Sequence, residues 1–161
     1  MAIPLVCPIG DGSKWDNNEL RFALRSIAAN WKNDSPVVII GSKPNIPTWL
    51  VGVETIVTKK GTQPEALAEA MKRFPEFGWF NDDMVILRDT QFSDLTQRLR
   101  HHGDLATTPE RTFPTGWHHH LWDTFDILKR QRRRTLNTAA HIPQFYESDK
   151  LASLRDFDLT R

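Results

Sequence analysis

The sequence predicts an α/β protein with a mostly parallel sheet and flanking helices. Apolar strand-like segments alternate with segments whose apolar residues recur at helical spacing. Residues 37–40 are a continuous run of Val and Ile, which is typical of a parallel strand buried on both faces. The 161 residues suffice for one compact domain. We therefore expect a single core over residues 1–138 and a C-terminal arm over residues 139–161.

The first expected elements are a strand and a helix. The apolar segment from Ile3 to Ile9 runs into a cluster of turn formers, Gly10-Asp11-Gly12-Ser13, so a strand ending in a loop is expected. Asp16 stands three residues ahead of Glu19, as in a capping box. The helix that follows would bury the apolar residues at helical spacing, namely Leu20, Ala23, Leu24, Ile27, Ala28 and Trp31.

The later elements are predicted in the same way. Alternation over residues 53–58 predicts another strand, and Pro64 suits the first turn of a helix. Residues 77–80 and 84–87 resemble one core strand interrupted by two acidic side chains. Residues 93–99 and 117–134 have the periodicity of a short and a long helix.

Composition excludes several classes of protein. With 39% hydrophobic residues and a net charge of +1, neither disorder nor a fibrous repeat fits. The apolar runs are far shorter than the roughly 20 residues that span a bilayer, so we expect no membrane span. Residues 1–10 carry no basic side chain and do not resemble a secretory signal. Cys7 is the single cysteine, which excludes an internal disulfide, and a reducing, cytoplasmic location is expected.

The most informative motif is Asn81-Asp82-Asp83, at the end of a predicted strand. Two neighbouring carboxylates repel each other and cost desolvation unless a cation or several donors face them. Mg²⁺ or Mn²⁺ prefers one or two carboxylates together with water and phosphate oxygens. The motif thus predicts a metal-bound nucleotide diphosphate at the strand end, and the alternative is a solvated turn.

Arg21 and Arg25 stand four residues apart, on a helical face away from the apolar stripe. Their guanidinium groups could clamp a diphosphate near the helix N-terminus. The alternative is a polar face that meets only water.

The six histidines all lie beyond residue 100. His118, His119 and His120 point in different directions on a helix, so a zinc site is not favoured. His141 precedes Ile142-Pro143, where a rigid turn could aim it as a general base.

Five positive charges occupy the six residues from Lys129 to Arg134. Such a block could follow the phosphates of DNA or RNA. It could equally be a solvated helix C-terminus, where cations complement the helix dipole, and the net charge of only +1 favours this second interpretation.

Several of these motifs together resemble the conserved regions of the Stealth proteins. The matching segments, in order, are VCPIGDGS from Val6, DNNELRFALRSI from Asp16, IPTWL from Ile46, WFNDDM from Trp79, and AHIP from Ala140 followed by Lys150 and Leu151. Stealth proteins include capsule polymerases and N-acetylglucosamine-1-phosphotransferase, which transfer a sugar 1-phosphate from a nucleotide sugar to a hydroxyl.

The resemblance implies a Rossmann-like scaffold related to glycosyltransferases of type A. It also implies a metal-dependent transfer of a sugar or sugar 1-phosphate to a polysaccharide or another hydroxyl acceptor. Asp82 and Asp83 would hold Mg²⁺ or Mn²⁺, and His141 or Asp11 would take the acceptor proton. The residues expected to bind the donor are Asn18, Arg21, Arg25 and Asn81.

Two departures from the family pattern keep alternatives open. The chain has no counterpart of a fourth conserved region, and Cys7-Pro8-Ile9-Gly10 replaces the usual tyrosine, threonine, tryptophan and valine before the Asp-Gly pair. A non-catalytic nucleotide-sugar-binding remnant is therefore a second hypothesis. A glycosyltransferase acting on a nucleic-acid acceptor, held by the block from Lys129 to Arg134, is a third.

Overall fold

The computed structural model describes residues 2–10, 16–96, 104–107, 116–135 and 143–152. The chain divides into two compact units, and each is described by itself. The first unit contains residues 1–97 and 141–156, and the second contains residues 98–140 and 157–161. Within the expected arm over residues 139–161, residues 144–152 belong to the first unit. The expected core over residues 1–138 stays a prediction.

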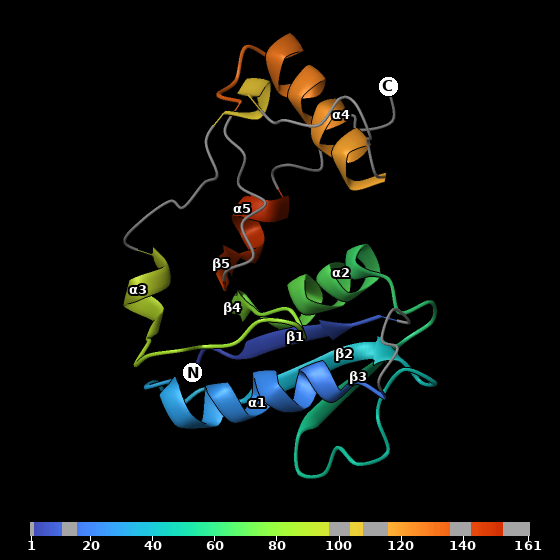
Figure 1. Cartoon of the computed structure of the whole chain (residues 1–161), viewed down its shortest axis with the longest axis vertical. Helices are drawn as coiled ribbons and strands as arrows, with labels where there is room; N and C mark the ends of the chain where they lie inside the picture. Colours follow the sequence, from blue (N-terminus) through green and yellow to red (C-terminus); the bar gives the residue numbers. More distant parts are fainter. Residues whose placement is uncertain (1, 11–15, 97–103, 108–115, 136–142, 153–161) are drawn as a thin grey trace. The chain divides into compact units, whose positions relative to one another are not determined.

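The first unit is built on a five-stranded sheet with the order β3-β2-β1-β4-β5 (Figure 1). The first four strands are parallel, and β5 pairs antiparallel with β4. The predicted α/β class with a mostly parallel sheet is confirmed. The strands are β1 (Leu5–Ile9), β2 (Val37–Ser42), β3 (Glu54–Thr58), β4 (Glu76–Trp79) and β5 (Gln144–Glu147).

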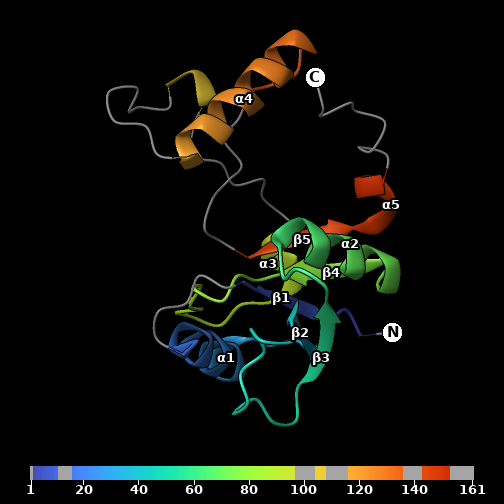
Figure 2. The ribbon, with the colours of Figure 1, turned by 90° about the vertical axis from the view of Figure 1, so that its right-hand side faces the viewer.

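Helices α1 (Asn18–Asn30) and α2 (Gln63–Arg73) cover opposite faces of this sheet (Figure 2). Alternate residues of β1 point to the two faces, as the pleat of a strand requires. Val6 packs with Ala66 and Ala70 of α2, whereas Leu5 packs with Ala23 of α1. Both faces are therefore buried, which explains the apolar sequences of β1 and β2.

The predicted capping box is wrong. Helix α1 begins at Asn18, and its N-cap is Asn17, which makes no side-chain capping hydrogen bond. Asp16 and Asn17 both have positive φ, 54° and 53°. Two successive left-handed residues turn the chain into the helix, so Asp16 stands one position too early to act as the N-cap.

The expected strand over residues 84–87 is also not formed. Met84 and Ile86 are buried while Val85 and Leu87 are 49% and 88% exposed, so the alternation typical of a strand is present. No neighbouring strand pairs with these residues within the described part of the chain. Instead Ile86 donates its N–H to Ser26 Oγ at 2.9 Å and accepts a bond from Asn30 Nδ2 at 2.5 Å.

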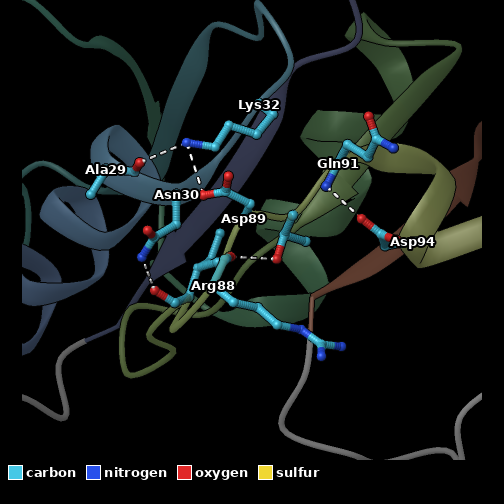
Figure 3. Close-up of polar contacts among 9 residues, drawn as sticks. Ala29, Asn30, Lys32, Arg88, Asp89, Gln91 and Asp94 are labelled. Carbon is cyan, nitrogen blue, oxygen red and sulfur yellow. Dashed lines mark hydrogen bonds and ion pairs between the residues drawn. The ribbon is translucent and has the colours of Figure 1, made fainter.

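Residues 81–91, which we call the post-β4 segment, are fastened to the end of α1 in this way. Lys32 continues the contact, because its amine lies 2.9 Å from the Asp89 carboxylate and also donates to the Ala29 carbonyl (Figure 3). Helix α3 (Phe92–Thr96) follows directly. It overlaps the helix predicted over residues 93–99, of which residues 97–99 lie outside the described residues.

Helix α5 (Ser148–Ala152) follows β5 in the first unit. The described elements of the second unit are η1 (Leu105–Thr107) and α4 (Gly116–Arg130). Helix α4 ends four residues before the predicted boundary at Arg134. Within the described ranges, we find no helix that combines the length and the apolar character needed to cross a membrane.

Candidate functional site

The strand order reverses between β1 and β4. The chain proceeds outward from β1 to β2 and β3, and then returns to place β4 on the other side of β1. In open α/β sheets, ligands bind outside the carboxyl ends of the strands at such a reversal. Val6 pairs with Trp79, so the loops that follow β1 and β4 leave the same edge of the sheet.

The acidic motif Asn81-Asp82-Asp83 stands at this edge. Asp82 is half-buried, and its pKa is raised from 3.8 to about 6, first by burial and then by the negative charges of Asp83 and Glu19. Backbone N–H groups of Asp82 and Asp83 act in the opposite direction. Both carboxylates also help to raise the pKa of the buried Cys7 thiol, after the larger effect of its burial. The motif therefore lies close enough to β1 for its charges to act on Cys7, with Asp82 half-buried and Asp83 exposed.

Glu19 is the site residue that the sequence analysis missed. The sequence pattern predicts a capping-box role for Glu19, whereas the structure places its carboxylate near enough to Asp82 to raise the pKa of that group. Its Oε2 atom is buried and has no hydrogen-bond donor in the described protein. Only the packing of α1 against residues 80–86, which follow β4, brings these residues together, and nothing in the local sequence indicates it.

Asn81 presents a second buried acceptor without a donor, its Oδ1 atom. Buried acceptors of this kind are rare in folded proteins and call for an explanation, such as a bound ion or a ligand group. The edge between β1 and β4 thus contains three carboxylates, Glu19, Asp82 and Asp83, and one amide oxygen.

A cationic side chain lies on the same helix as Glu19. The guanidinium of Arg21 stacks 4.1 Å from the centroid of the Trp49 ring, and its Nε atom is buried without an acceptor. Stacking on an aromatic face restricts the side chain while leaving its N–H groups available. Arg25 and Asn18 are exposed, so of the three expected donor-binding residues on α1, only Arg21 is held in place by a described contact.

The loop after β3 is ordered by Glu65 at the start of α2. Its carboxylate accepts N–H bonds from Lys59, Lys60 and Gly61 at 3.1, 2.7 and 3.1 Å. The bond from Lys60 is the largest influence that lowers the pKa of Glu65. Gly61 has a φ of 69°, which favours glycine, and its carbonyl lies close to Gly10 after β1.

The two expected catalytic residues, Asp11 and His141, lie outside the described residues. The structure therefore brings together Asn81, Asp82 and Asp83 but does not place either candidate base.

The chemistry of these donors fits a divalent cation only in part. Oxygen ligands suit Mg²⁺ and Mn²⁺, and Mg²⁺ needs only one or two carboxylates when substrate phosphates supply the rest. However, the described residues contain no group of three or more His, Cys, Asp or Glu side chains arranged to hold one metal ion. A metal at this edge would thus depend on Asp82, Asp83 and oxygens of a ligand.

No model of a known protein family matches the chain, and no curated protein matches it. The resemblance to the Stealth proteins therefore rests on the short motifs described above, and it supports a proposal about function rather than membership of that family.

Proposed function

We propose that the protein is a metal-dependent transferase that moves a sugar or sugar 1-phosphate from a nucleotide-sugar donor to a hydroxyl acceptor. The observation that carries the proposal is the half-buried Asp82, which stands beside Asp83 and Glu19 where the strand order reverses. Three negative charges at one sheet edge repel one another, and a cation that arrives with a diphosphate would relieve this repulsion.

Each residue of the site has a role in this proposal. Asp82 and Asp83 would hold Mg²⁺ or Mn²⁺, which supplies neutralisation of the donor diphosphate. Arg21, restrained by Trp49, would neutralise the leaving nucleotide phosphate. Asn81 would accept a hydrogen bond from the donor through its buried Oδ1 atom.

The reaction forms one bond and breaks one. The acceptor oxygen attacks either the sugar-side phosphorus or the anomeric carbon, and the nucleotide leaves with the bonding electron pair. The acceptor proton passes to a base, for which His141 or Asp11 is proposed from the motif resemblance.

The test is nucleotide release from a panel of nucleotide sugars in the presence of Mn²⁺. Asp83→Asn should abolish turnover without unfolding the protein, because it removes a ligand charge at the sheet edge. A chelator should likewise abolish the turnover of the wild-type protein. Asp89→Asn is the matched control, because this exposed carboxylate pairs with Lys32 away from the site. Unchanged turnover in Asp83→Asn would refute the metal-binding role.

A second candidate function is non-catalytic binding of a nucleotide sugar. It is favoured by the departure of Cys7-Pro8-Ile9-Gly10 from the Stealth pattern before the Asp-Gly pair. Calorimetric titration with a nucleotide sugar and Mn²⁺ separates the two candidates. Binding without nucleotide release over long incubation indicates the non-catalytic function, and release of nucleotide indicates the transferase.

A further inference from the structure

The second unit carries a cationic surface that the proposed function does not use. Lys129, Arg130, Arg132, Arg133 and Arg134, together with Gln131, are all exposed at the C-terminal end of α4. We call these six residues the basic block. Five like charges in so short a segment repel one another and create a strong local positive potential.

Backbone groups and one arginine side chain bond to the carbonyls at the end of α4. The carbonyls of Ile127, Leu128 and Lys129 accept backbone N–H bonds from residues 131, 133 and 132 at 3.0, 2.9 and 3.0 Å. Arg130 Nε already bonds to the Asp126 carbonyl. Backbone N–H groups therefore satisfy three of the last four carbonyls of α4.

The backbone at Arg132 adds an independent observation. The two bonds from residues 132 and 133 form a Schellman motif, whose left-handed position is usually occupied by glycine. Here that position holds Arg132, with a φ of 53°. Arginine is unfavourable at this position of the turn, where glycine would fit best. Its presence there points to a use for the charge of Arg132.

We propose that the basic block binds the phosphate backbone of a nucleic-acid strand. Arginine predominates over lysine in it by four to one, and the planar guanidinium fork matches phosphate oxygens. An anionic membrane is a poorer fit, because helices that dock on membranes insert exposed apolar side chains. The exposed large hydrophobic residues of the described chain, Phe22, Val51, Val57, Val85 and Leu87, all lie in the first unit.

This inference does not rest on the proposed transferase activity. The experiment measures binding of the full chain to a labelled single-stranded RNA and to a DNA duplex over a range of salt concentrations. Log affinity should fall linearly with log salt, and each phosphate contact contributes a slope of about −0.7 on single strands and about −0.9 on duplex DNA. The double variant Arg132→Gln/Arg134→Gln should reduce the magnitude of the slope on RNA by about 1.4.

Two further variants make the test specific. Lys72→Gln/Arg73→Gln removes the same charge from the last turn of α2 and should leave binding unchanged. Arg132→Gly should raise the melting temperature, because glycine relieves the left-handed position, and should nevertheless weaken binding. A purely structural role for Arg132 does not predict opposite effects on stability and binding.

Three results would overturn the proposal. The first is no binding to either nucleic acid at low salt. The second is a salt slope that is the same in the double variant and the wild type. The third is binding only to vesicles of phosphatidylcholine with phosphatidylserine, which would assign the block to membranes.

Discussion

Asp82 experiences opposing influences on its ionisation. Burial and the charges of Asp83 and Glu19 disfavour its ionised form, while backbone N–H groups favour it. The pKa near 6 means that the group is mostly ionised at pH 7 although the fold would prefer it neutral. A residue in this state stabilises the protein only when it is protonated or when a cation is bound.

The first prediction concerns the stability of Asp82→Asn. Since the folded-state pKa lies above the unfolded value of 3.8, wild-type stability should decline as the pH rises from about 4 to 6. Solvent screens this half-buried group, so the variant should be more stable at pH 7.5 by only about 1 to 2 kcal/mol. Urea unfolding at pH 7.5 and pH 3.5 measures this, and the advantage should vanish at the lower pH.

Asp89→Asn serves as the comparison, because Asp89 is exposed and paired with Lys32. It should change the free energy of unfolding by about 1 kcal/mol or less. An equal gain in stability from both substitutions at pH 7.5 would contradict the special environment of Asp82.

The second prediction concerns Arg21→Ala, and it depends on the proposed function. Loss of a charge-assisted contact should weaken donor binding by about 1 to 3 kcal/mol, with little effect on the fold. Titration of the nucleotide sugar measures this. Arg25→Ala is the matched control, because Arg25 is exposed on the same helix and should matter less. Equal losses in the two variants would argue against restraint by Trp49.

At the residue scale, the sequence predicted the acidic motif but not its full environment. Asn81, Asp82 and Asp83 are adjacent in the chain, so their shared location follows from the strand that precedes them. Glu19 joins them only because α1 packs against residues 80–86 after β4, and Trp49 meets Arg21 only because the loop after β2 returns over α1. Such contacts depend on tertiary packing, which no local pattern encodes.

Among the elements, the post-β4 segment shows how side chains substitute for strand pairing. Ser26 is buried in α1; its hydroxyl donates to the Ala23 carbonyl at 2.7 Å and accepts the Ile86 N–H. Asn30 supplies a donor for the Ile86 carbonyl. The post-β4 segment, which begins with the acidic motif, is thereby tied to helix α1, and this limits how far the motif can move.

The third prediction tests this attachment with Ser26→Ala. The substitution leaves the buried Ile86 N–H without an acceptor, so the free energy of unfolding should fall by about 1 to 3 kcal/mol. Hydrogen exchange of the Ile86 amide should also accelerate. Ser35→Ala is the control, because the buried Ser35 Oγ has no hydrogen-bond partner, and its removal should cost little. Slow exchange at Ile86 in Ser26→Ala would show that other contacts hold the segment.

The predictions of helices and strands succeeded where apolar residues form a continuous run or recur at a regular spacing in the sequence. The runs in β1 and β2, and proline in the first turn of α2, are confirmed. The prediction failed over residues 84–87, because the alternation of buried and exposed side chains does not show whether a neighbouring strand is present to pair with them. It failed at Asp16 because Asp and Asn are favoured both at the N-cap and in left-handed backbone, so composition does not distinguish the two.

For the whole molecule, β5 closes one side of the first unit. It covers β4 with antiparallel pairing, and Tyr146 packs against Phe77 and Trp79. The expected arm over residues 139–161 thus supplies a strand of the sheet. The sequence did not indicate this strand, because its four residues are too few to show a clear alternation of apolar and polar side chains.

The fourth prediction follows from this closure. A chain truncated after residue 140 should lose the pairing partner of β4 and uncover Phe77 and Trp79, so it should aggregate or unfold at a lower temperature than the full chain. Size-exclusion chromatography and thermal melting measure this. Truncation after residue 156 keeps β5 and α5 and should preserve the melting temperature of the sheet. If the chain truncated after residue 140 were monomeric and as stable as the full chain, a structural role for β5 would be contradicted.

The single cysteine gives the protein an internal reporter. Cys7 sits in the central strand with about 1% of its surface exposed, and its thiol has a raised pKa, so it should resist alkylating and disulfide-forming reagents in the native state. Reaction requires the middle of the sheet to separate from its covering helix. The labelling rate with a thiol reagent therefore measures how often the core opens, without any engineered probe.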